Sequence, residues 1–557
     1  MALTKAHNRM IAGTPVSVLD FGAVGDGVID DTAALKACFD YAIPLKRTVT
    51  IPDGTYKISG PIQPYATRTS GGLHINLESN VIIEVDSGST AFSDVLYFAT
   101  NDYNSASITG GILQIEGNDK AGRGISIRHN DSSGGSVNIT AAVKIKNIKE
   151  NSSTEARENS AMEIYGDYGK ILVQDLYIES VQRTNTSAGA TKGLSVSQFS
   201  GLATIENVYV KNVLTPSDSD ADGIAVFGKT IGASASTNAR AGVARVNNCV
   251  FIDCQGRSVK SQCSETTIYR PKVTRESYTS ITNGIDFDFQ LGGTSLLIEP
   301  TIEYYKLANG NSPLGASHAC VTFQQNLSDK INDGKAVGGT VITEVVIPRY
   351  CTLLQQSSAE SSYTEVSDLN IIPYGTLTTT ALNRGIIEFS GGEVAAKSTE
   401  TTVIVRNVRG PIAIYAIGYT NYTSGDVSQK LSFEVTDCHN TLNATDYRPF
   451  RQLSGNPILE VKSFRIQNNY GFISLVESGW TFNFNNLVPR NAFTVDIASV
   501  NATNAPSWGS SGYGFVEVLD EWSNGGLLHA RVTVNSATSS NSVFFTQQPS
   551  SGWGTIK

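Results

Sequence analysis

The chain has 557 residues and a net charge of −9, and 17% of its residues are charged while 40% are hydrophobic. This length exceeds what one compact core usually holds and favours several domains or one repeat fold. The composition excludes a disordered acidic chain and a long coiled coil, and the lack of lysine–arginine blocks argues against a nucleic-acid partner.

Targeting signals and cysteine motifs are missing from the sequence. The first ten residues lack the apolar stretch of a secretory signal, and no run of about 18 apolar residues predicts a membrane span. The seven cysteines are scattered, without a CxxC pair or a cysteine–histidine cluster of zinc spacing. We therefore expect buried free thiols, synthesis in a reducing cytosol, no membrane partner, and neither a metal nor a cofactor.

Residues 16–58 stand apart from the rest of the chain. Val16–Thr32 predicts a short strand, a glycine-rich turn and the start of a helix capped by Asp30 or Asp31, and Pro44 ends that helix. Residues 48–56 then predict strand, turn and strand. Because neither a P-loop lysine nor an EF-hand glutamate follows the Gly-Asp-Gly turn, we expect an N-terminal cap instead of a phosphate or metal loop.

A six-residue pattern recurs irregularly from about residue 100 to residue 440, with apolar residues at its first, usually its fourth, and its sixth position. Its copies are 173–178, 205–210, 246–251, 268–273, 297–302, 342–347 and 366–371. The third position of these and weaker copies is often Asn or Asp, as in Asn147, Asp175, Asn207, Asn248, Asp368, Asn407 and Asp437. These residue types tolerate the left-handed backbone of a tight turn.

A second short strand recurs between the copies of that pattern. It occupies residues 124–128, 161–165, 193–197, 223–227, 258–262, 284–288 and 320–324. Short strands that repeat every 20–45 residues or so, with turns between them, predict a stacked β-solenoid. A sandwich would instead keep its strands about 8–12 residues apart and join them by hairpin dipeptides, which are scarce here.

The last hundred residues change in character. All four tryptophans lie there, and residues 515–519 and 527–534 read as antiparallel strands joined at Asn524-Gly-Gly. The sequence therefore predicts an all-β chain with an N-terminal cap helix and four parts. These are an N-terminal peptide (1–15), a cap with the first coils (16–100), a central β-helix (101–454) and a C-terminal antiparallel β-domain (455–557).

Residues 18–58 resemble the opening of pectate-lyase-like right-handed parallel β-helices, above all those of bacteriophage tailspikes. The matching strings are VLDFGAVGDGVIDDTAALKACFDYA and VTIPDGTYKISGPI, and the segment from Trp522 to Gly526 and the terminal Ser-Gly-Trp553-Gly look like the ends of phage tail fibres. The resemblance implies a homotrimeric spike of the virion that degrades a bacterial surface polysaccharide, capsule or O-antigen. Its N-terminal peptide would dock to other tail proteins, and its C-terminal domain would trimerise or bind carbohydrate.

Outward side chains of stacked coils form ladders, because strands of neighbouring coils lie about 4.8 Å apart. Acidic and basic residues converge in three such ladders, which hold Ser126, Glu163, Ser195, Ala225, Lys260 and Asp286; Lys192, Asp222 and Arg257; and Tyr165, Phe227 and Asp288. A slip of one residue in any strand would turn its faces inside out.

Glycoside cleavage needs two carboxyl groups, about 6.5–9.5 Å apart in inverting and about 5–5.5 Å apart in retaining enzymes. We expect Asp222 and Asp286, two coils apart, to form an acid/base pair in the inverting range, with Asp288, Asp220 and Glu163 as substitutes. The segment 218–223 resembles the Asn-Thr-Asp-Gly motif of polygalacturonases, with Asp220 at the Asn position. Residues 256–260 resemble their Arg-Ile-Lys motif, but their Gly-His-Gly and Asp-Asp motifs are missing.

Several roles stay open for these residues. Arg257 and Lys260 could bind sugar carboxylates or form ion pairs with Asp222 or Asp286, and Tyr165 and Phe227 could stack on sugars or simply pack. The run from Asp218 to Asp222 could also be a solvated loop or ligate calcium. A lyase using Lys260 or Arg257 as base, and a glycan-binding adhesin, are the rival functions; we expect no esterase, because residue order shows no Ser–His–Asp arrangement.

Overall fold

A computed structural model gives the fold of the chain. It describes residues 13–64, 71–100, 103–129, 134–150, 158–184, 189–216, 220–231, 240–281, 284–290, 293–315, 317–325, 332–345, 349–355, 361–375, 385–391, 400–411, 414–420, 429–441, 448–452, 459–467, 494–495, 513–522, 527–535, 540–548 and 552–556. The chain divides into two compact units: unit 1 has residues 1–288 and 305–318, and unit 2 has residues 289–304 and 319–557.

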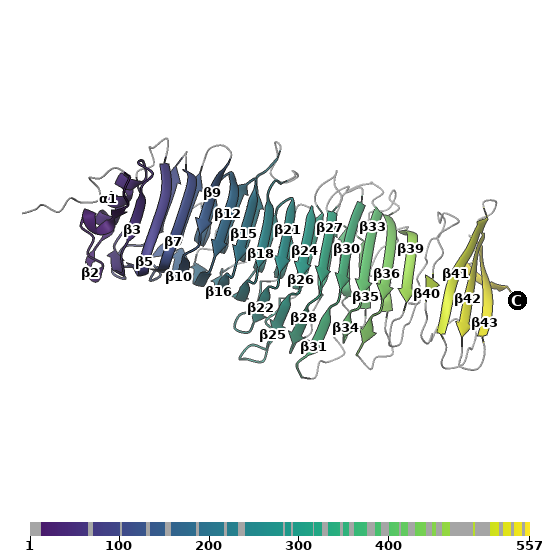
Figure 1. The fold of residues 1–557 in the computed structure, drawn as a ribbon. Helices are drawn as coiled ribbons and strands as arrows, with labels where there is room; N and C mark the ends of the chain where they lie inside the picture. The colour runs from purple at the N-terminus through teal and green to yellow at the C-terminus, as the bar shows by residue number, and fades with distance from the viewer. Residues whose placement is uncertain are drawn as a thin grey trace, which may run out of the picture. The chain divides into compact units, whose positions relative to one another are not determined.

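From β9 (Gly135–Ile139) onward, unit 1 is built from coils of three strands each (Figure 1). The coil of β12 (Tyr168–Gln174), β13 (Leu176–Arg183) and β14 (Thr191–Phe199) is followed by that of β15 (Leu202–Glu206), β16 (Tyr209–Leu214) and β17 (Ala221–Gly228). Each strand pairs in parallel with its equivalent in the next coil. The expected right-handed parallel β-helix is therefore confirmed, because crossovers between parallel strands of one sheet are nearly always right-handed.

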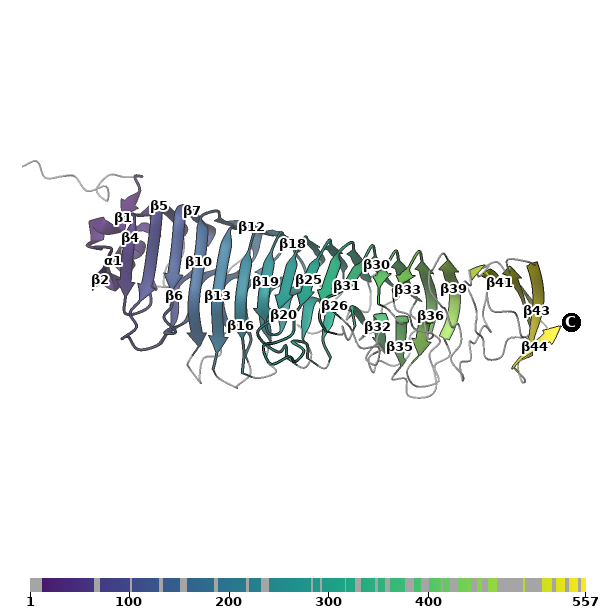
Figure 2. The same ribbon diagram turned by 90° about the horizontal axis from the view of Figure 1, so that it is seen from below.

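The other coils from β9 to β23 repeat the same arrangement, and Figure 2 shows β10, β13, β16 and β19 as neighbours in one parallel sheet. Before them, the long strand β5 pairs with both β3 and β4, and the long strand β7 pairs with both β9 and β10. The bounds of all these strands are β1 (Val16–Ser17), β2 (Asp26–Asp30), β3 (Thr48–Ile51), β4 (Gly54–Ile58), β5 (Gly71–Val85), β6 (Phe92–Thr100), β7 (Tyr103–Glu116), β8 (Ala121–His129), β9 (Gly135–Ile139), β10 (Ala142–Glu150), β11 (Asn159–Tyr165), β18 (Val243–Asn247), β19 (Val250–Cys254), β20 (Arg257–Gln262), β21 (Glu265–Tyr269), β22 (Lys272–Arg275) and β23 (Ile285–Phe289).

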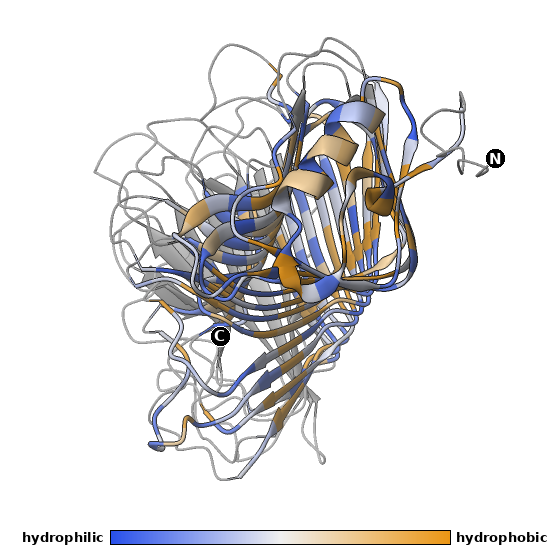
Figure 3. Cartoon of the chain, turned by 90° about the vertical axis from the view of Figure 1, so that its left-hand side faces the viewer, coloured by the Kyte–Doolittle hydropathy of each residue, from blue (hydrophilic) through white to orange (hydrophobic). Residues whose placement is uncertain are grey.

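The interior of each coil is a stack of apolar side chains in register. Leu194 of β14, Ile224 of β17 and Val259 of β20 are partners in successive coils, and all three are fully buried. Hydrophobic and hydrophilic residues alternate along the strands (Figure 3), because successive side chains of a strand point to opposite faces. Burial of the apolar set drives the stacking and leaves the alternate, outward residues free to carry chemistry.

Asn and Asp residues turn many of the corners between the first and second strand of a coil, and Arg270 turns the one between β21 and β22. All seven that we expected in left-handed turns have positive φ, including 52° at Asp175, 55° at Asn207 and 52° at Asn248. Asp175 lies between β12 and β13, so the six-residue pattern spans a corner and is not a single strand. The Asn207 amide also donates a 3.2 Å hydrogen bond to Asp175 Oδ1, which links the corners of neighbouring coils.

Replacing the three stacked corner residues Asp175, Asn207 and Asn248 together by alanine should lower the free energy of unfolding by about 3 kcal/mol, since a left-handed backbone costs a residue with an ordinary side chain roughly 1 kcal/mol or more. The matched triple glycine variant loses the same side-chain contacts without that strain. Denaturant unfolding compares the two variants. Equal stability of the alanine and glycine variants would contradict the role assigned to these corners.

Unit 2 also contains parallel strands. Their bounds are β24 (Thr294–Ile298), β25 (Thr301–Tyr304), β26 (Ala319–Gln325), β27 (Asn332–Val337), β28 (Thr340–Thr343), β29 (Cys351–Gln355), β30 (Ser361–Ser367), β31 (Asn370–Pro373), β32 (Gly385–Gly391), β33 (Glu400–Arg406), β34 (Arg409–Gly410), β35 (Ile414–Thr420), β36 (Gln429–Thr436), β37 (His439–Asn440), β38 (Arg448–Gln452), β39 (Leu459–Gln467) and β40 (Thr494–Val495).

One copy of the six-residue pattern in unit 2 was misplaced. We expected residues 342–347 to follow 297–302, but Leu297 pairs with Ala336 and Ile302 with Val341. The corner of that coil uses Gly338 and Gly339, whose φ angles are 70° and 120°. Glycine also stands at the fourth position, which is usually apolar, so the pattern is not recognisable there.

The N-terminal helix α1 (Thr32–Ala42) follows the short 3-10 helix η2 (Val18–Phe21) and packs against β1 and β3. Leu35, Cys38 and Phe39 form its buried face. Asp31 occupies the N-cap position, yet its carboxylate accepts hydrogen bonds from the amides of Val24 and Gly25, at 2.7 and 3.1 Å. It thus fixes the glycine-rich turn before the helix; the capping role of this region stays a prediction.

The C-terminal strands differ from the others in direction. β41 (Tyr513–Trp522), β42 (Leu527–Asn535), β43 (Ser540–Gln548) and β44 (Gly552–Ile556) form an antiparallel sheet. Strand β39 still pairs in parallel with β36, so parallel pairing extends past residue 454. The four-part division stays a prediction, and most of the N-terminal peptide, Trp480 and Trp508 lie outside the described residues.

The cysteines are all free and buried, which agrees with the expectation from their spacing. Within the part of the chain that the structure describes, no helix is long and apolar enough to span a membrane.

Candidate functional site

From β8 to β20, the three ladders expected from the sequence form on the third strands of unit 1. Asp222 of β17 pairs with Arg257 of β20, and Ala225 pairs with Lys260. Glu163 of β11 reaches the same ladder through Ser195 of β14. The register from β8 to β20 is therefore the one we expected, and it places Asp222, Arg257 and Lys260 close together.

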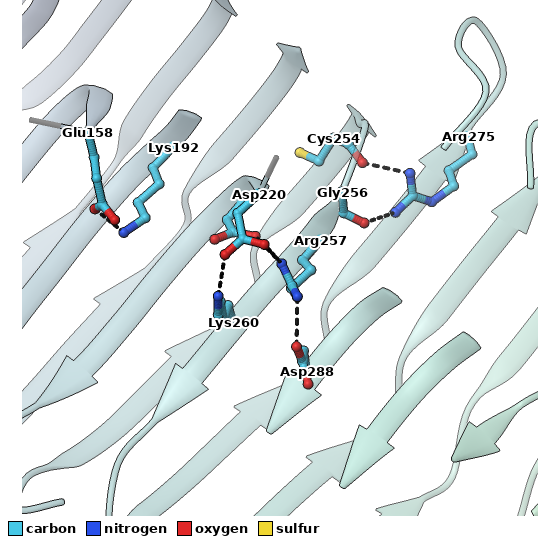
Figure 4. A network of polar contacts seen from close by, with 10 residues as sticks. Glu158, Lys192, Asp220, Cys254, Gly256, Arg257, Lys260, Arg275 and Asp288 are labelled. Carbon is cyan, nitrogen blue, oxygen red and sulfur yellow. Dashed lines mark hydrogen bonds and ion pairs between the residues drawn. The ribbon is translucent and has the colours of Figure 1, made fainter. Parts of the chain in front are cut away.

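Five side chains meet there, which we call the ion cluster: Asp220, Asp222, Arg257, Lys260 and Asp288. Figure 4 shows the contacts among Asp220, Arg257, Lys260 and Asp288. Arg257 Nη1 lies 2.6 Å from Asp220 Oδ1 and 3.4 Å from Asp222 Oδ1. Its Nε donates to Asp288 Oδ2 at 2.6 Å, and the ammonium of Lys260 binds the second oxygen of Asp220. Of the two roles left open for the cations, pairing with acidic residues is the one seen.

The pKa values of Asp222 and Asp220, two neighbouring carboxyl groups of the cluster, are shifted in opposite directions. Burial raises the pKa of Asp222 to about 6, although Arg257 and Lys260 act against this shift. Burial would also raise the pKa of Asp220, but the two cations outweigh it and lower that pKa to about 2. Asp222 is fully buried and its Oδ2 has no hydrogen-bond partner, whereas the Asp220 side chain is 34% exposed.

Arg257 stays charged in this setting. Burial disfavours its charged form, but the carboxylates of Asp288, Asp222 and Asp220 together raise its pKa. Arg257 therefore cannot act as the proton-abstracting base that the lyase alternative would require of it.

A further ion pair adjoins the cluster, between Lys192 of the expected ladder and Glu158, which the sequence did not single out. Lys192 of β14 pairs in register with Asp222 and is 1% exposed, and its ammonium binds the carboxylate of Glu158. The same ammonium lies 4.5 Å from the ring centre of Phe227, and the ammonium of Lys260 lies 5.8 Å from it. Phe227, for which stacking on sugar and packing were both left open, thus contacts two cations.

Asp286 does not join Asp222. Its Oδ1 accepts from Arg275, with Nε at 2.8 Å and Nη2 at 2.7 Å, and its Oδ2 lies 3.2 Å from His318 Nε2. Both Asp286 and His318 are fully buried. Arg275 also donates to the carbonyls of Cys254, at 2.6 Å, and Gly256, at 3.2 Å (Figure 4). The expected pairing of Asp222 with Asp286 therefore has no counterpart in the structure.

The cause is the register of β23. The amide of Ile285 donates to the carbonyl of Gly256 at 3.2 Å, whereas we expected Ile285 beside Val259. Asp288, and not Asp286, therefore reaches Arg257, while Asp286 contacts Arg275.

Ser280 extends the contacts of Asp286 into a buried Ser–His–Asp chain. Its Oγ lies 3.3 Å from His318 Nδ1 and accepts the amide of Gly315 at 2.6 Å. In serine hydrolases Nε2 faces the serine and Nδ1 the aspartate; here the two nitrogens are reversed. Ser280 is 4% exposed and His318 is fully buried, so these contacts hold the coils together and present no nucleophile to solvent.

Glu163 and Tyr165 form a separate group. Arg128 Nη1 lies 3.3 Å from Glu163 Oε1, and the Arg128 guanidinium lies 4.4 Å from the ring centre of Tyr165. Ser195 separates Glu163 from Ala225 in the ladder. The structure therefore does not bring the substitute acid Glu163 or the expected sugar platform Tyr165 into the ion cluster.

Metal ligation was a further possibility for the segment 218–222. Among the described residues no group of three His, Cys, Asp or Glu side chains is placed to hold a metal ion. Asp218 lies outside the described residues.

Comparison with known proteins confirms the resemblance of the N-terminal region. Residues 15–255 match the family model described as "Rhamnogalacturonase A/epimerase, pectate lyase-like". The mannuronan C5-epimerase AlgE5 of Azotobacter vinelandii is 46% identical over 68 residues, which is 12% of this chain and 6% of the epimerase. The chain thus spans a small part of that relative.

Solved structures show likeness at lower identity. The surface adhesin PfbA of Streptococcus pneumoniae aligns with 79% of this chain and 100% of that one, at 11% identity and a TM-score of 0.42. The tailspike of E. coli bacteriophage HK620, in complex with a pentasaccharide, aligns with 97% of this chain and 92% of that one, at 11% identity and a TM-score of 0.40. At this level of similarity, neither structure decides the activity of this chain.

Proposed function

We propose that the protein binds and hydrolyses a polysaccharide, with Asp222 as the general acid and Asp220 as its ionised partner. One observation carries the proposal: two carboxyl groups that contact the same nitrogen of Arg257 have pKa values near 6 and near 2. Environments that separate the pKa values of two such groups mark acid and base assignments. Asp220 takes the place that we expected for Asp286, because Asp286 is bound by Arg275 and His318.

The chemistry follows from the protonation states. Protonated Asp222 donates its proton to the leaving glycosidic oxygen, and the Asp220 carboxylate activates a water or attacks the sugar carbon. Asp288 holds the guanidinium that lies between the two acids. Because Asp222 is fully buried, the proposal entails a local rearrangement that uncovers it when the glycan binds.

A polysaccharide is the proposed substrate because the matching family model is pectate-lyase-like and includes a rhamnogalacturonase. A lyase has less support, since the charged Arg257 and the carboxylate-bound Lys260 are poor bases. A reducing-end assay on bacterial surface polysaccharides tests cleavage, and ultraviolet absorbance of an unsaturated product would indicate the lyase. The proposal would be overturned if the protein produced no new reducing ends from any polysaccharide that it binds.

Glycan binding without cleavage is the second candidate function. It is favoured by the complete burial of Asp222 and by the internal ion pairs of Arg257 and Lys260. The same assay separates the two candidates, because an adhesin would bind the polysaccharide and leave its chain length unchanged.

We further propose that the protein is a tailspike of a phage virion, made in the host cytoplasm and attached to other tail proteins by residues 1–15. The tailspike resemblance of residues 18–58 supports this proposal. The substrate would then be a capsule or O-antigen of the host.

The tailspike proposal predicts a homotrimer. Analytical ultracentrifugation of the full chain should give three times the 59.5 kDa of one chain, without dissociation at micromolar concentration. A monomer as the sole species would contradict the assembly and leave the chemistry of the ion cluster untouched.

A further inference from the structure

The charges around the ion cluster bear on the kind of sugar that it accepts. We infer that the sugar unit seated on the ion cluster is electrically neutral, such as a hexose, a deoxyhexose or an N-acetylhexosamine, and not a uronic acid or another acidic sugar. This inference rests on the proposed function and names its substrate class.

Each cation at the site already has a carboxylate of its own. Lys192 binds Glu158, Lys260 binds Asp220, and Arg257 binds Asp288. Asp222 is the fourth carboxyl group, with one oxygen 3.4 Å from Arg257 and the other without a hydrogen-bond partner. When Asp222 is protonated, three positive charges balance three negative ones, and a neutral sugar preserves that balance.

The geometry of the cations points the same way. The Nε and Nη1 atoms of Arg257 are both engaged by aspartates, so its planar fork is not open to a sugar carboxylate. The side chains of Arg257 and Lys260 are only 13% and 11% exposed, and that of Lys192 is 2% exposed. A carboxylate on the sugar would have to displace Asp220, or add an unpaired negative charge to a largely buried site, which is unfavourable.

A neutral sugar suits the groups that do face outward. The Asp220 side chain is the most exposed acid of the ion cluster. Its carboxylate accepts hydrogen bonds and donates none, so sugar hydroxyl groups match it and a second carboxylate does not.

Matched polysaccharides test the inference. Capsular polysaccharides from a panel of bacteria are offered in native form and after carboxyl reduction, which turns each uronate into a neutral sugar with the same linkages. Binding is measured to the Asp222→Asn variant, which keeps the shape of the protonated acid and leaves the polysaccharide uncut. Where native and reduced forms differ at the bound unit, we expect the reduced form to bind about tenfold more tightly or better.

A second substitution in the same background sharpens the result. Asp220→Asn removes the carboxylate that pairs with both Lys260 and Arg257 Nη1, so the preference for the reduced form should shrink or reverse. Adding Lys260→Met to this variant should remove the gain, because the ammonium of Lys260 is gone. Tighter binding of the native, carboxylated form by the Asp222→Asn variant would overturn the inference.

The products keep this inference distinct from the proposed hydrolysis. If the wild-type protein hydrolyses a glycosidic bond whose seated sugar unit is a uronic acid, the neutral-sugar inference is overturned and the hydrolase is supported. Tight binding of neutral glycans without any cleavage would support the inference and refute the hydrolase.

Discussion

Asp222→Asn should reduce the rate of polysaccharide cleavage by about 100- to 10,000-fold, the range that a general acid contributes. The amide has the size of the protonated carboxyl group but has no acidic proton to give to the leaving oxygen. Since Asp222 is fully buried and its neighbour Arg257 keeps two other carboxylates, the variant should fold normally. Initial rates from reducing ends on a cleaved polysaccharide give the ratio.

A matched variant shows whether the loss is specific. Asp175→Asn makes the same chemical change at a corner of unit 1, where φ is 52° and asparagine is equally suited. It should cleave at the wild-type rate. Full activity of Asp222→Asn, with binding unchanged, would remove Asp222 from the mechanism.

Asp286→Ala should lower the free energy of unfolding by about 3–5 kcal/mol, the cost of leaving one partner of a buried ion pair behind. The substitution removes the carboxylate partner of the fully buried Arg275. Arg275 keeps its contacts with the carbonyls of Cys254 and Gly256 and further interactions within the coil. Denaturant unfolding measures the loss. Cleavage by the variant under conditions where it stays folded should remain within about tenfold of wild type.

The double variant Arg275→Met, Asp286→Leu is the control for this pair. Replacing both ions by apolar residues of similar size avoids leaving the buried Arg275 charge unpaired, so much of the stability should return. Wild-type stability of Asp286→Ala together with abolished cleavage would instead assign Asp286 the catalytic role that its sequence position suggested.

The ladders show how much of the site can be read from residues alone. The pattern of small residue, apolar residue, outward residue and apolar or small residue repeats in residues 193–196, 223–226 and 258–261, and it fixed the pairing of Asp222 with Arg257 correctly. The corners that carry Asn or Asp were equally predictable, because these residue types tolerate the left-handed backbone, whereas the glycine corner at Gly338 was missed.

The last coil of the site could not be aligned in this way. Residues 284–287, Gly-Ile-Asp-Phe, imitate the repeat, yet the position of β23 depends on contacts of Asp286 with Arg275 and His318, which come from other parts of the coil. Likewise Asp220 and Asp222 are two residues apart, and nothing in the letters shows that one is fully buried and the other partly exposed. Those differences arise from packing between coils.

The pH dependence of kcat/KM tests the central claim, the division of labour between Asp222 and Asp220, most directly. The acid works only while protonated, so kcat/KM should fall as pH rises through about 6, by tenfold per pH unit above it. The base works only while ionised, so the acid limb should appear only as pH falls towards about 2. A rate that is constant or rising between about pH 5 and pH 8 would contradict the claim.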